Sequence, residues 1–323
     1  MSIRNIPTLP MLVEEVMQPT ALSIGAGESL PAAVRSMQAL GVRRLLVLED
    51  GRLMGLLTAG AVDRALPKLA DARTPWEYIL QADRLRVIMR RDLCITRPGD
   101  PVHQAIRTLL KHKVGGLPVV NAHDVLVGLL TVTDVMRAAL ATPQFDLGTV
   151  GEHLSGGTVT VSPETTLAEA EARMMATRLR ILPVTHGRTL LGALHQQDIW
   201  DAMKYRQVEH KTVLEAVFTD NHAPFRYKTV LDLKCLPGVV VQADTPLPEA
   251  VLAMLNADVY GLAVTGSDPR EFLGVITMSD ILRALLTKVR GTIPPLNSAP
   301  PGNGPTVALH PRFSEYSRSG GAI

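Results

Sequence analysis

Three carboxylates stand at the same place in a short motif that recurs along the chain. Each follows a threonine or histidine by three residues, and the pairs are Thr131 and Asp134, His195 and Asp198, and Thr277 and Asp280. An ionised carboxylate has two acceptor oxygens and can bind two donors at once. A threonine followed three residues later by an acid is also typical of a helix N-terminal cap, which binds no ligand. His195 fits the cap less well, because imidazole is a poorer cap than a hydroxyl.

The sequence contains no recognisable catalytic set. A glycine-rich phosphate loop, an HExxH motif, a CxxC motif and a serine or cysteine nucleophile elbow are all absent. His103, His112 and His123 are not spaced as metal ligands on one helix face. Cys94 and Cys235 fit neither a disulfide framework nor a metal motif. We therefore predict a protein that is not an enzyme and requires no metal or cofactor.

The aspartates belong to a repeated unit. The copies of the motif read GLLTAGA (55–61), GLLTVTD (128–134), GALHQQD (192–198) and GVITMSD (274–280). Such self-similarity means that one supersecondary unit has been copied. In the first copy Ala61 takes the place of the acid.

The residues before each motif indicate which elements position it. A strand-like run comes about ten residues earlier, at 43–48, 115–120, 180–185 and 260–265. Each run is preceded by apolar residues at spacings of three and four, as in a helix. Earlier still comes a short β-branched strand with a turn, at 94–101, 160–166 and 240–246, and more weakly at 23–29. Each unit therefore reads strand, helix, strand, strand, helix.

This order, with the GLPV and GLLTVTD signatures of the second copy, resembles the cystathionine β-synthase (CBS) domain. The resemblance covers roughly residues 11 to 287, and it departs from the family pattern where Leu46 and Ala263 replace a proline. It implies an α+β fold with four β-α-β-β-α repeats arranged as two pseudo-two-fold pairs. The layout is similar to that of the γ subunit of AMP-activated protein kinase.

The repeats predict the domain boundaries. A linker at 141–149 contains Pro143 and Gly148, which end the helix before it. The tail from 288 is rich in proline, glycine and serine, and we expect it to be disordered. The predicted parts are an N-terminal segment (1–10), a first pair (11–140, copies 11–66 and 85–140), the linker, a second pair (150–287, copies 150–203 and 230–287) and the tail (288–323).

The composition is that of a globular protein with a sizeable core. Hydrophobic residues make up 46% of the chain and charged residues 20%, while aromatic residues make up only 4%. No apolar run approaches the length of a membrane span and no secretory leader opens the chain, so we expect a cytoplasmic protein. The net charge of +2 and the few aromatic residues do not favour a nucleic-acid binder.

The resemblance implies clefts for adenosine-containing ligands, in which the aspartate accepts hydrogen bonds from both ribose hydroxyls. The threonine or histidine would help to hold the sugar and phosphate edge, and strand backbone would recognise the adenine. AMP, ADP or ATP are the ligands expected first, and S-adenosylmethionine, NAD or a cyclic dinucleotide are alternatives. The residues implied are Ile95, Gly116, Leu117, Thr131 and Asp134; Thr160, Arg180, His195 and Asp198; and Val240, Gly261, Thr277 and Asp280. Ala61 cannot accept from a ribose, so the first cleft is expected to be empty or weak.

Basic residues near the helix ends are candidates to bind phosphate. They are Arg43, Arg44, His112, Lys113 and Arg178. The alternative is that they are solvated charges that complement the C-terminal helix dipole.

Two functions remain open at this point. One is a regulatory adenine-nucleotide sensor that acts on a separate protein partner. The other is a ligand-free scaffold for protein interaction or oligomerisation. The four copies could close into a disc within one chain, or two chains could pair.

Overall fold

The computed structural model describes residues 11–40, 42, 44–59, 61–62, 84–142, 147–154, 159–187, 189–204, 228–233 and 239–290. The predictions for the N-terminal segment, for Arg43 and for the tail from 291 lie outside these residues. The described chain forms two compact units, one with residues 11–101 and 114–131 and the other with residues 102–113 and 132–293. Each unit is described by itself.

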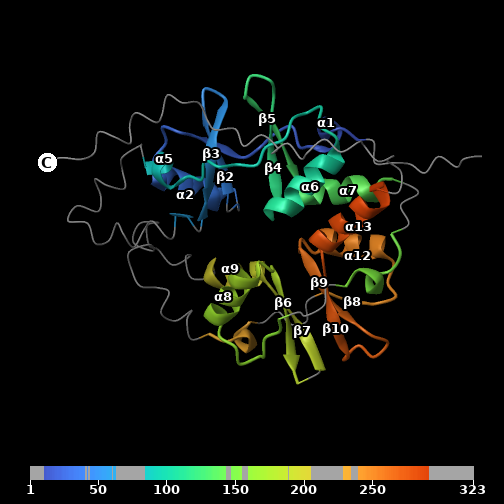
Figure 1. The fold of residues 1–323 in the computed structure, drawn as a ribbon. Helices are drawn as coiled ribbons and strands as arrows, with labels where there is room; N and C mark the ends of the chain where they lie inside the picture. The colour runs from blue at the N-terminus through green and yellow to red at the C-terminus, as the bar shows by residue number, and fades with distance from the viewer. Residues whose placement is uncertain are drawn as a thin grey trace, which may run out of the picture. The chain divides into compact units, whose positions relative to one another are not determined.

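The unit that begins at residue 11 holds a three-stranded sheet and a hairpin (Figure 1). In the sheet β1 pairs in parallel with β2, which pairs antiparallel with β3. In the hairpin β4 and β5 are antiparallel. The elements are α1 (Val13–Val16), β1 (Ser23–Gly25), α2 (Leu30–Ala39), β2 (Arg44–Glu49), β3 (Arg52–Thr58), α5 (Arg84–Ile88), β4 (Gly116–Val120) and β5 (Leu126–Thr131).

The other unit holds the third and fourth copies and two helices of the second copy. Its sheets are the hairpin β6–β7 and the three-stranded sheet β10-β9-β8, in which β8 is parallel to β9. The elements are α6 (Val102–His112), α7 (Val132–Leu140), the 3-10 helix η1 (Val150–His153), α8 (Leu167–Thr177), β6 (Ile181–His186), β7 (Thr189–His195), α9 (Gln196–Lys204), the 3-10 helix η2 (Val230–Asp232), β8 (Val240–Gln242), α12 (Leu247–Asn256), β9 (Gly261–Thr265), β10 (Phe272–Thr277) and α13 (Met278–Arg290).

The predicted order of elements and the α+β fold class are confirmed. The first strand of the repeat is shorter than expected in the second and third copies. There it is a single parallel bridge, Thr96 to Val119 in the second copy and Val161 to Val184 in the third. In the second copy Pro98 comes two residues after the bridged residue Thr96. Proline lacks an amide donor for a strand ladder, which accounts for the early end.

Equivalent residues of two copies meet across a pseudo-two-fold axis in each pair. Arg52 and Val125 form an antiparallel bridge, as do Thr189 and Glu271, and all four lie three residues before a motif glycine. Reciprocal bridges flank them and obey the same symmetry. These are Gln18 to Leu129 with Leu56 to Arg90, and Thr149 to Pro246 with Thr166 to Thr229.

A glycine makes this approach feasible. A Cβ on Gly128 would lie 2.6 Å from the carbonyl oxygen of Gln18, and a Cβ on Gly55 would lie 2.9 Å from that of Arg90. These distances are below ordinary van der Waals contact. In the first and second copies the first residue of the motif is therefore glycine, because the entry segment of the other copy passes over it.

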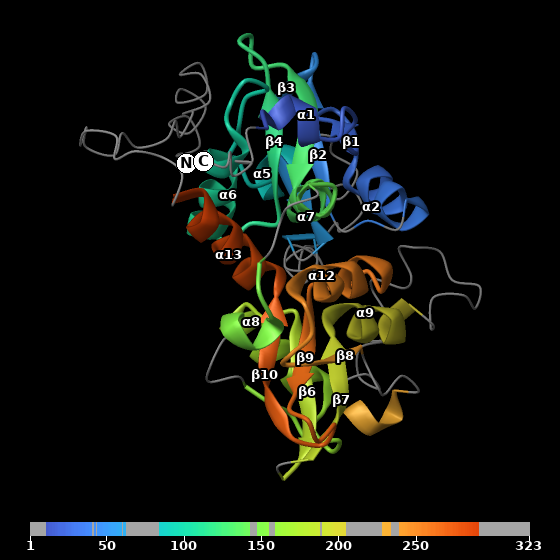
Figure 2. The ribbon, with the colours of Figure 1, turned by 90° about the vertical axis from the view of Figure 1, so that its right-hand side faces the viewer.

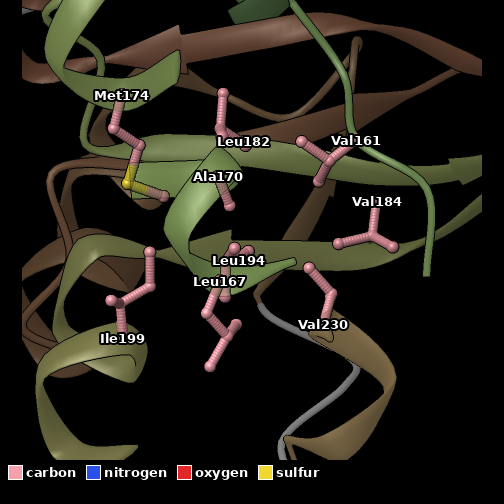
Figure 3. Packing of buried hydrophobic residues seen from close by; sticks show 9 residues of the cluster. All are labelled: Val161, Leu167, Ala170, Met174, Leu182, Val184, Leu194, Ile199 and Val230. Carbon is pink, nitrogen blue, oxygen red and sulfur yellow. The ribbon is translucent and has the colours of Figure 1, made fainter. Parts of the chain in front are cut away.

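The third copy has its own apolar core between its helices and its hairpin (Figure 3). α8 and α9 lie side by side against β6 and β7 (Figure 1). The buried residues are Val161, Leu167, Ala170, Met174, Leu182, Val184, Leu194, Ile199 and Val230. The other face of β6 and β7 buries Ile181, Leu190 and Ala193 with Ala263 of the fourth copy.

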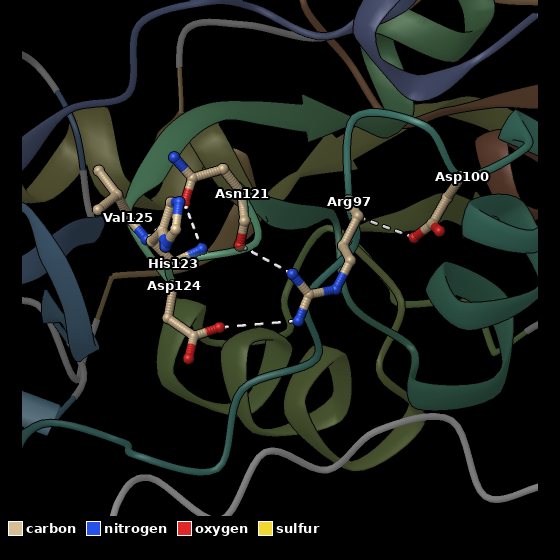
Figure 4. A network of polar contacts seen from close by, with 6 residues as sticks. All are labelled: Arg97, Asp100, Asn121, His123, Asp124 and Val125. Atoms are coloured by element: carbon tan, nitrogen blue, oxygen red, sulfur yellow. Dashed lines mark hydrogen bonds and ion pairs between the residues drawn. The ribbon is translucent and has the colours of Figure 1, made fainter.

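A polar network holds the turn between β4 and β5 in the second copy (Figure 4). Arg97 donates to the carbonyl oxygen of Asn121 at 2.8 Å and lies 3.7 Å from the Asp124 carboxylate. The Asn121 side chain accepts from the amides of His123 and Val125. All these contacts are internal, so the network has a structural role.

α6 and α7 pack against α12 and α13, although they come from the second and fourth copies (Figure 2). The buried residues of α6 are Val102, Ala105, Ile106 and Leu109, which share one face of the helix. Among the described helices none combines the length and the apolar character needed to cross a bilayer.

Candidate functional site

The Asp280 carboxylate lies at the start of α13 and binds groups of its own copy. Its Oδ2 accepts from the Thr277 amide at 2.9 Å and from the Thr277 hydroxyl at 2.5 Å. Its Oδ1 accepts from Arg283 Nη1 at 2.5 Å. Asp280 is 6% exposed, so these bonds offset the cost of burying its charge. The helix-capping role considered from the sequence is therefore present in the fourth copy.

Asp198 has the same relation to its helix in the third copy. Its Oδ2 accepts from the His195 amide at 2.7 Å, at the start of α9. The side chain that stands in place of the threonine is an imidazole, which leaves the carboxylate without the hydroxyl contact that Thr277 makes. The two sites therefore share the backbone bond and differ in the side chain.

His195 is the least satisfied polar side chain of this region. The residue is 7% exposed, and neither Nδ1 nor Nε2 has a hydrogen-bond partner among the described residues. Burial lowers the pKa of His195 from 6.5 to about 4, because the charged form loses its hydration. The ring is therefore neutral at physiological pH and offers one donor and one acceptor.

The register of the hairpin places His195 on the face that meets the fourth copy. His195 pairs with Ile181, and side chains opposite each other in an antiparallel pair share a face. Ile181 packs with Ala263, and a Cβ on Gly261 would lie 3.0 Å from its Cγ2. The imidazole thus occupies the seam between the third and fourth copies.

The remaining predicted residues of the second pair lie on neighbouring strands. Gly261 pairs with Thr277, and Val240 pairs with Ala263 in parallel. The Thr160 carbonyl oxygen accepts from Arg173 Nη1 at 3.1 Å. The amides that begin the two helices bond to carbonyls just before the hairpins, Gln196 to Arg180 at 2.9 Å and Met278 to Tyr260 at 3.1 Å.

In the second copy the described residues fall in both units. Gly116 pairs with Thr131, Leu117 is fully buried, and Ile95 packs on a cluster with Leu46 and Val120. Asp134, in the other unit, has a side chain only 3% exposed, and its Oδ1 lies 3.8 Å from Arg137 Nη1.

In the first copy the loss of the acid changes the cap. Thr58 Oγ1 accepts from the Ala61 amide at 3.1 Å, which is the ordinary N-terminal cap of a threonine. The first copy therefore has the structural half of the motif and lacks the carboxylate.

The basic residues predicted to bind phosphate lie at the surface. Arg44, His112, Lys113 and Arg178 are all exposed. Lys113 and Arg178 follow α6 and α8 with positive φ angles of 53° and 58°, as residues do that end a helix in the left-handed conformation. Their backbone role at the helix ends is thus visible, and their predicted role as phosphate ligands remains a prediction.

Two arginines of the site were not singled out from the sequence. Arg137 and Arg283 each lie three residues after a motif aspartate and contact its carboxylate. The signal was present as Thr-x-x-Asp-x-x-Arg in the second and fourth copies. Among the described residues no group of three His, Cys, Asp or Glu side chains comes together as a metal site.

Solved structures share this fold. Protein MJ1225 of Methanocaldococcus jannaschii superposes with a TM-score of 0.69 and 20% identity over 84% of this chain and 99% of its own. A conserved protein of Pyrococcus horikoshii superposes with a TM-score of 0.60 and 18% identity over 85% of this chain and 100% of its own. At these identities the likeness concerns the fold.

Sequence relatives match a shorter part of the chain. MJ1225 is 28% identical over 118 residues, which are 34% of this chain and 41% of that protein. A homoserine O-acetyltransferase of Methanococcoides burtonii is 27% identical over 126 residues, 39% of this chain and 23% of that enzyme. The match thus spans less than half of the length of these relatives.

The CBS domain family model matches four segments, at residues 13–68, 85–141, 150–203 and 234–287. Together they cover more than half of the 323 residues. The chain belongs to the CBS domain family, with four copies in two tandem pairs.

Proposed function

We propose that this chain is a non-catalytic regulatory protein whose CBS pairs bind adenosine-containing ligands of the AMP, ADP or ATP class. Ligand binding would be communicated to a separate partner protein through a change in conformation or assembly. The observation that carries the proposal is His195, a buried imidazole with neither ring nitrogen bonded within the described chain. An unpaired buried polar group costs stability, and a ligand that supplies its partners recovers that cost.

The chemistry of the surrounding groups supports a ligand with hydroxyls. Asp198 and Asp280 stand at two helix starts of the second pair, where the helix dipole favours a negative group. Ionised carboxylates bind hydroxyl donors strongly, and the neutral imidazole of His195 can add one donor and one acceptor. A ribose with two hydroxyls and an adenine edge matches this set.

The alternative is a ligand-free scaffold, and a specific observation favours it. The Asp280 carboxylate already binds Thr277 and Arg283, so capping alone gives it a role. His195 separates the two functions, because a scaffold gains nothing from an unpaired buried imidazole.

The test is a thermal-shift screen of the wild type and His195→Leu with AMP, ADP, ATP, S-adenosylmethionine, NAD and cyclic dinucleotides. A ligand at a concentration a hundredfold above its Kd should raise the free energy of unfolding of the wild type by about 2.7 kcal/mol. Leucine removes the unsatisfied nitrogens, so the free variant should be as stable as the wild type or more stable, with a smaller ligand shift.

His153→Leu is the matched control. His153 Nε2 contacts the Leu147 carbonyl oxygen at 2.7 Å, so its loss should lower the melting temperature and leave the ligand shift unchanged. If no nucleotide at millimolar concentration shifts the melting temperature of the wild type, the proposed sensor function is rejected and the scaffold function remains.

A further inference from the structure

The helix α6 of the second copy has basic residues along its whole length and no acidic residue (Figure 2). His103, Arg107 and Lys111 recur at intervals of four residues, so they form one row on the helix with steps of about 6 Å. The buried residues of α6 lie on its opposite side. Arg107 and Lys111 are exposed and His103 is half-buried, so the basic row faces solvent.

The equivalent helices of the other copies do not have this row. α2 contains one charged residue, Arg35, and α12 contains one, Glu249. α8 contains Glu169, Glu171 and Arg173, and so has a net negative charge. The four helices hold the same place in the repeat. The basic row of α6 is therefore not a requirement of the repeat itself.

Helix stability does not account for the row either. Positive charge stabilises the last turn of a helix and destabilises the first. Lys111 lies in the last turn of α6 and follows this rule. His103 lies in the first turn, where α8 and α12 have Glu169 and Glu249. The pKa of His103 is lowered, first by burial and then by the positive charge of Arg107.

The row has no partner of opposite charge within the described part of the chain. Among those residues no ion pair joins His103, Arg107 or Lys111 to a carboxylate. Like charges one turn apart on a helix repel each other. The row therefore costs this helix some stability without a compensating contact, which indicates a role outside the fold.

We propose that the face of α6 with His103, Arg107 and Lys111 docks an acidic helix of a partner protein. Carboxylates at positions i, i+4 and i+8 of a partner helix have the same spacing of about 6 Å, so each can meet one basic side chain. The inference goes beyond the proposed function, because it names the chemistry of a protein partner and does not depend on nucleotide binding.

Two other kinds of anion fit this face less well. Nucleic acid favours a broad positive surface with aromatic side chains, whereas 31 acidic residues offset 33 lysines and arginines here and only 4% of the residues are aromatic. A helix that lies on a membrane inserts its apolar face among the lipids. The apolar face of α6, with Val102 and Ile106, is buried in the protein.

The test is fluorescence anisotropy with a labelled alanine-rich peptide that has glutamates at i, i+4 and i+8. The wild type should bind this peptide, more weakly at high salt, and should prefer it to a peptide with the same glutamates spread around the helix. Arg107→Gln/Lys111→Gln should weaken binding by about tenfold, as expected for the loss of two exposed ion pairs. Its melting temperature should be unchanged or higher, because the repulsion within the row is removed.

Arg52→Gln/Arg270→Gln is the matched control. It removes two exposed positive charges from the ends of other strands, at β3 and before β10, and should leave peptide binding unchanged. Equal binding by the two double variants, or no binding by the wild type, would overturn the proposal.

Three further measurements on the wild type and the α6 variant identify other occupants. Binding of duplex DNA or of phosphatidylserine vesicles that only the α6 variant loses, with no binding of the peptide, would assign the face to that anion and overturn the proposal. Self-association in sedimentation experiments that only the α6 variant loses would assign it to a second copy, with the same consequence. The nucleotide thermal-shift screen is independent of all these results, so the two proposals can fail separately.

Discussion

The guanidinium of Arg180 stacks on the ring of Tyr260, with Cζ 4.2 Å from the ring centroid. The two residues hold the same place in the third and fourth copies, directly before the strands β6 and β9. Their carbonyl oxygens accept from the first residues of α9 and α13. One cation–π contact therefore joins the two helix starts that carry Asp198 and Asp280.

This stacking should be measurable as a coupling energy. In a double-mutant cycle of Arg180→Met and Tyr260→Leu, we expect about 0.5–1 kcal/mol of interaction in denaturant unfolding, because the contact is only partly buried. Additive losses within about 0.3 kcal/mol would show that the two side chains do not interact in solution.

The motif glycine of the second copy should not tolerate a side chain. In Gly128→Ala the new Cβ would meet the Gln18 carbonyl oxygen at 2.6 Å and Met17 Sδ at 2.8 Å. We expect a loss of about 1–3 kcal/mol in the free energy of unfolding, as for other overpacked sites. Gly99→Ala is the control, since nothing lies within 4 Å of its Cβ; equal stability of the two variants would contradict the close approach.

The third copy should depend on the apolar face of β7. Leu194 is 1% exposed and belongs to the core of Figure 3, whereas Leu191 on the same strand is 42% exposed. Leu194→Ala should cost about 2–5 kcal/mol, and Leu191→Ala should cost much less because it opens no cavity. Chemical unfolding of both variants measures the difference, and similar losses would argue against the described burial.

Stability should fall in acid through His195. Burial lowers its pKa from 6.5 to about 4, so between these values the unfolded chain binds a proton that the folded chain does not. The contribution of His195 to the free energy of unfolding is therefore greatest above pH 6.5. It falls by roughly 3 kcal/mol in total as the pH falls towards 4. His195→Leu should remove this part of the pH dependence, which unfolding curves at pH 7, 6, 5 and 4.5 would show. Parallel curves for the variant and the wild type would mean that the imidazole is not buried.

The repeats and their hairpins could be predicted from the sequence, because they depend on local patterns. The glycine at the start of the motif and the apolar run before it lie on adjacent strands, so one copy is sufficient to define them. The sequence pattern overestimates the length of the first strand in the second copy, because only Thr96 pairs there, with Val119. The stacking of Arg180 on Tyr260 could not be predicted, because it depends on how two copies pack.

The sequence could predict which motif residues lie at the helix starts, but it could not predict what they contact. Asp280 and His195 were found from the motif, but the partners of a carboxylate depend on the rotamers of Thr277 and Arg283. The burial of His195 depends on the seam with the fourth copy, which no local pattern encodes. Arg137 and Arg283 stand at a fixed spacing after Asp134 and Asp280, but whether a guanidinium contacts the carboxylate depends on side-chain rotamers that the spacing does not define.

Calorimetric titration of adenosine into the wild type and Asp280→Asn tests the central claim most directly. Asparagine keeps an acceptor for the Thr277 amide, so the free energy of unfolding should change by about 1 kcal/mol or less. If Asp280 holds a ribose, adenosine binding in the fourth copy should weaken by about 1.5–3 kcal/mol, the worth of hydrogen bonds to a charged group. Unchanged affinity and stoichiometry in Asp280→Asn would show that this carboxylate only caps its helix.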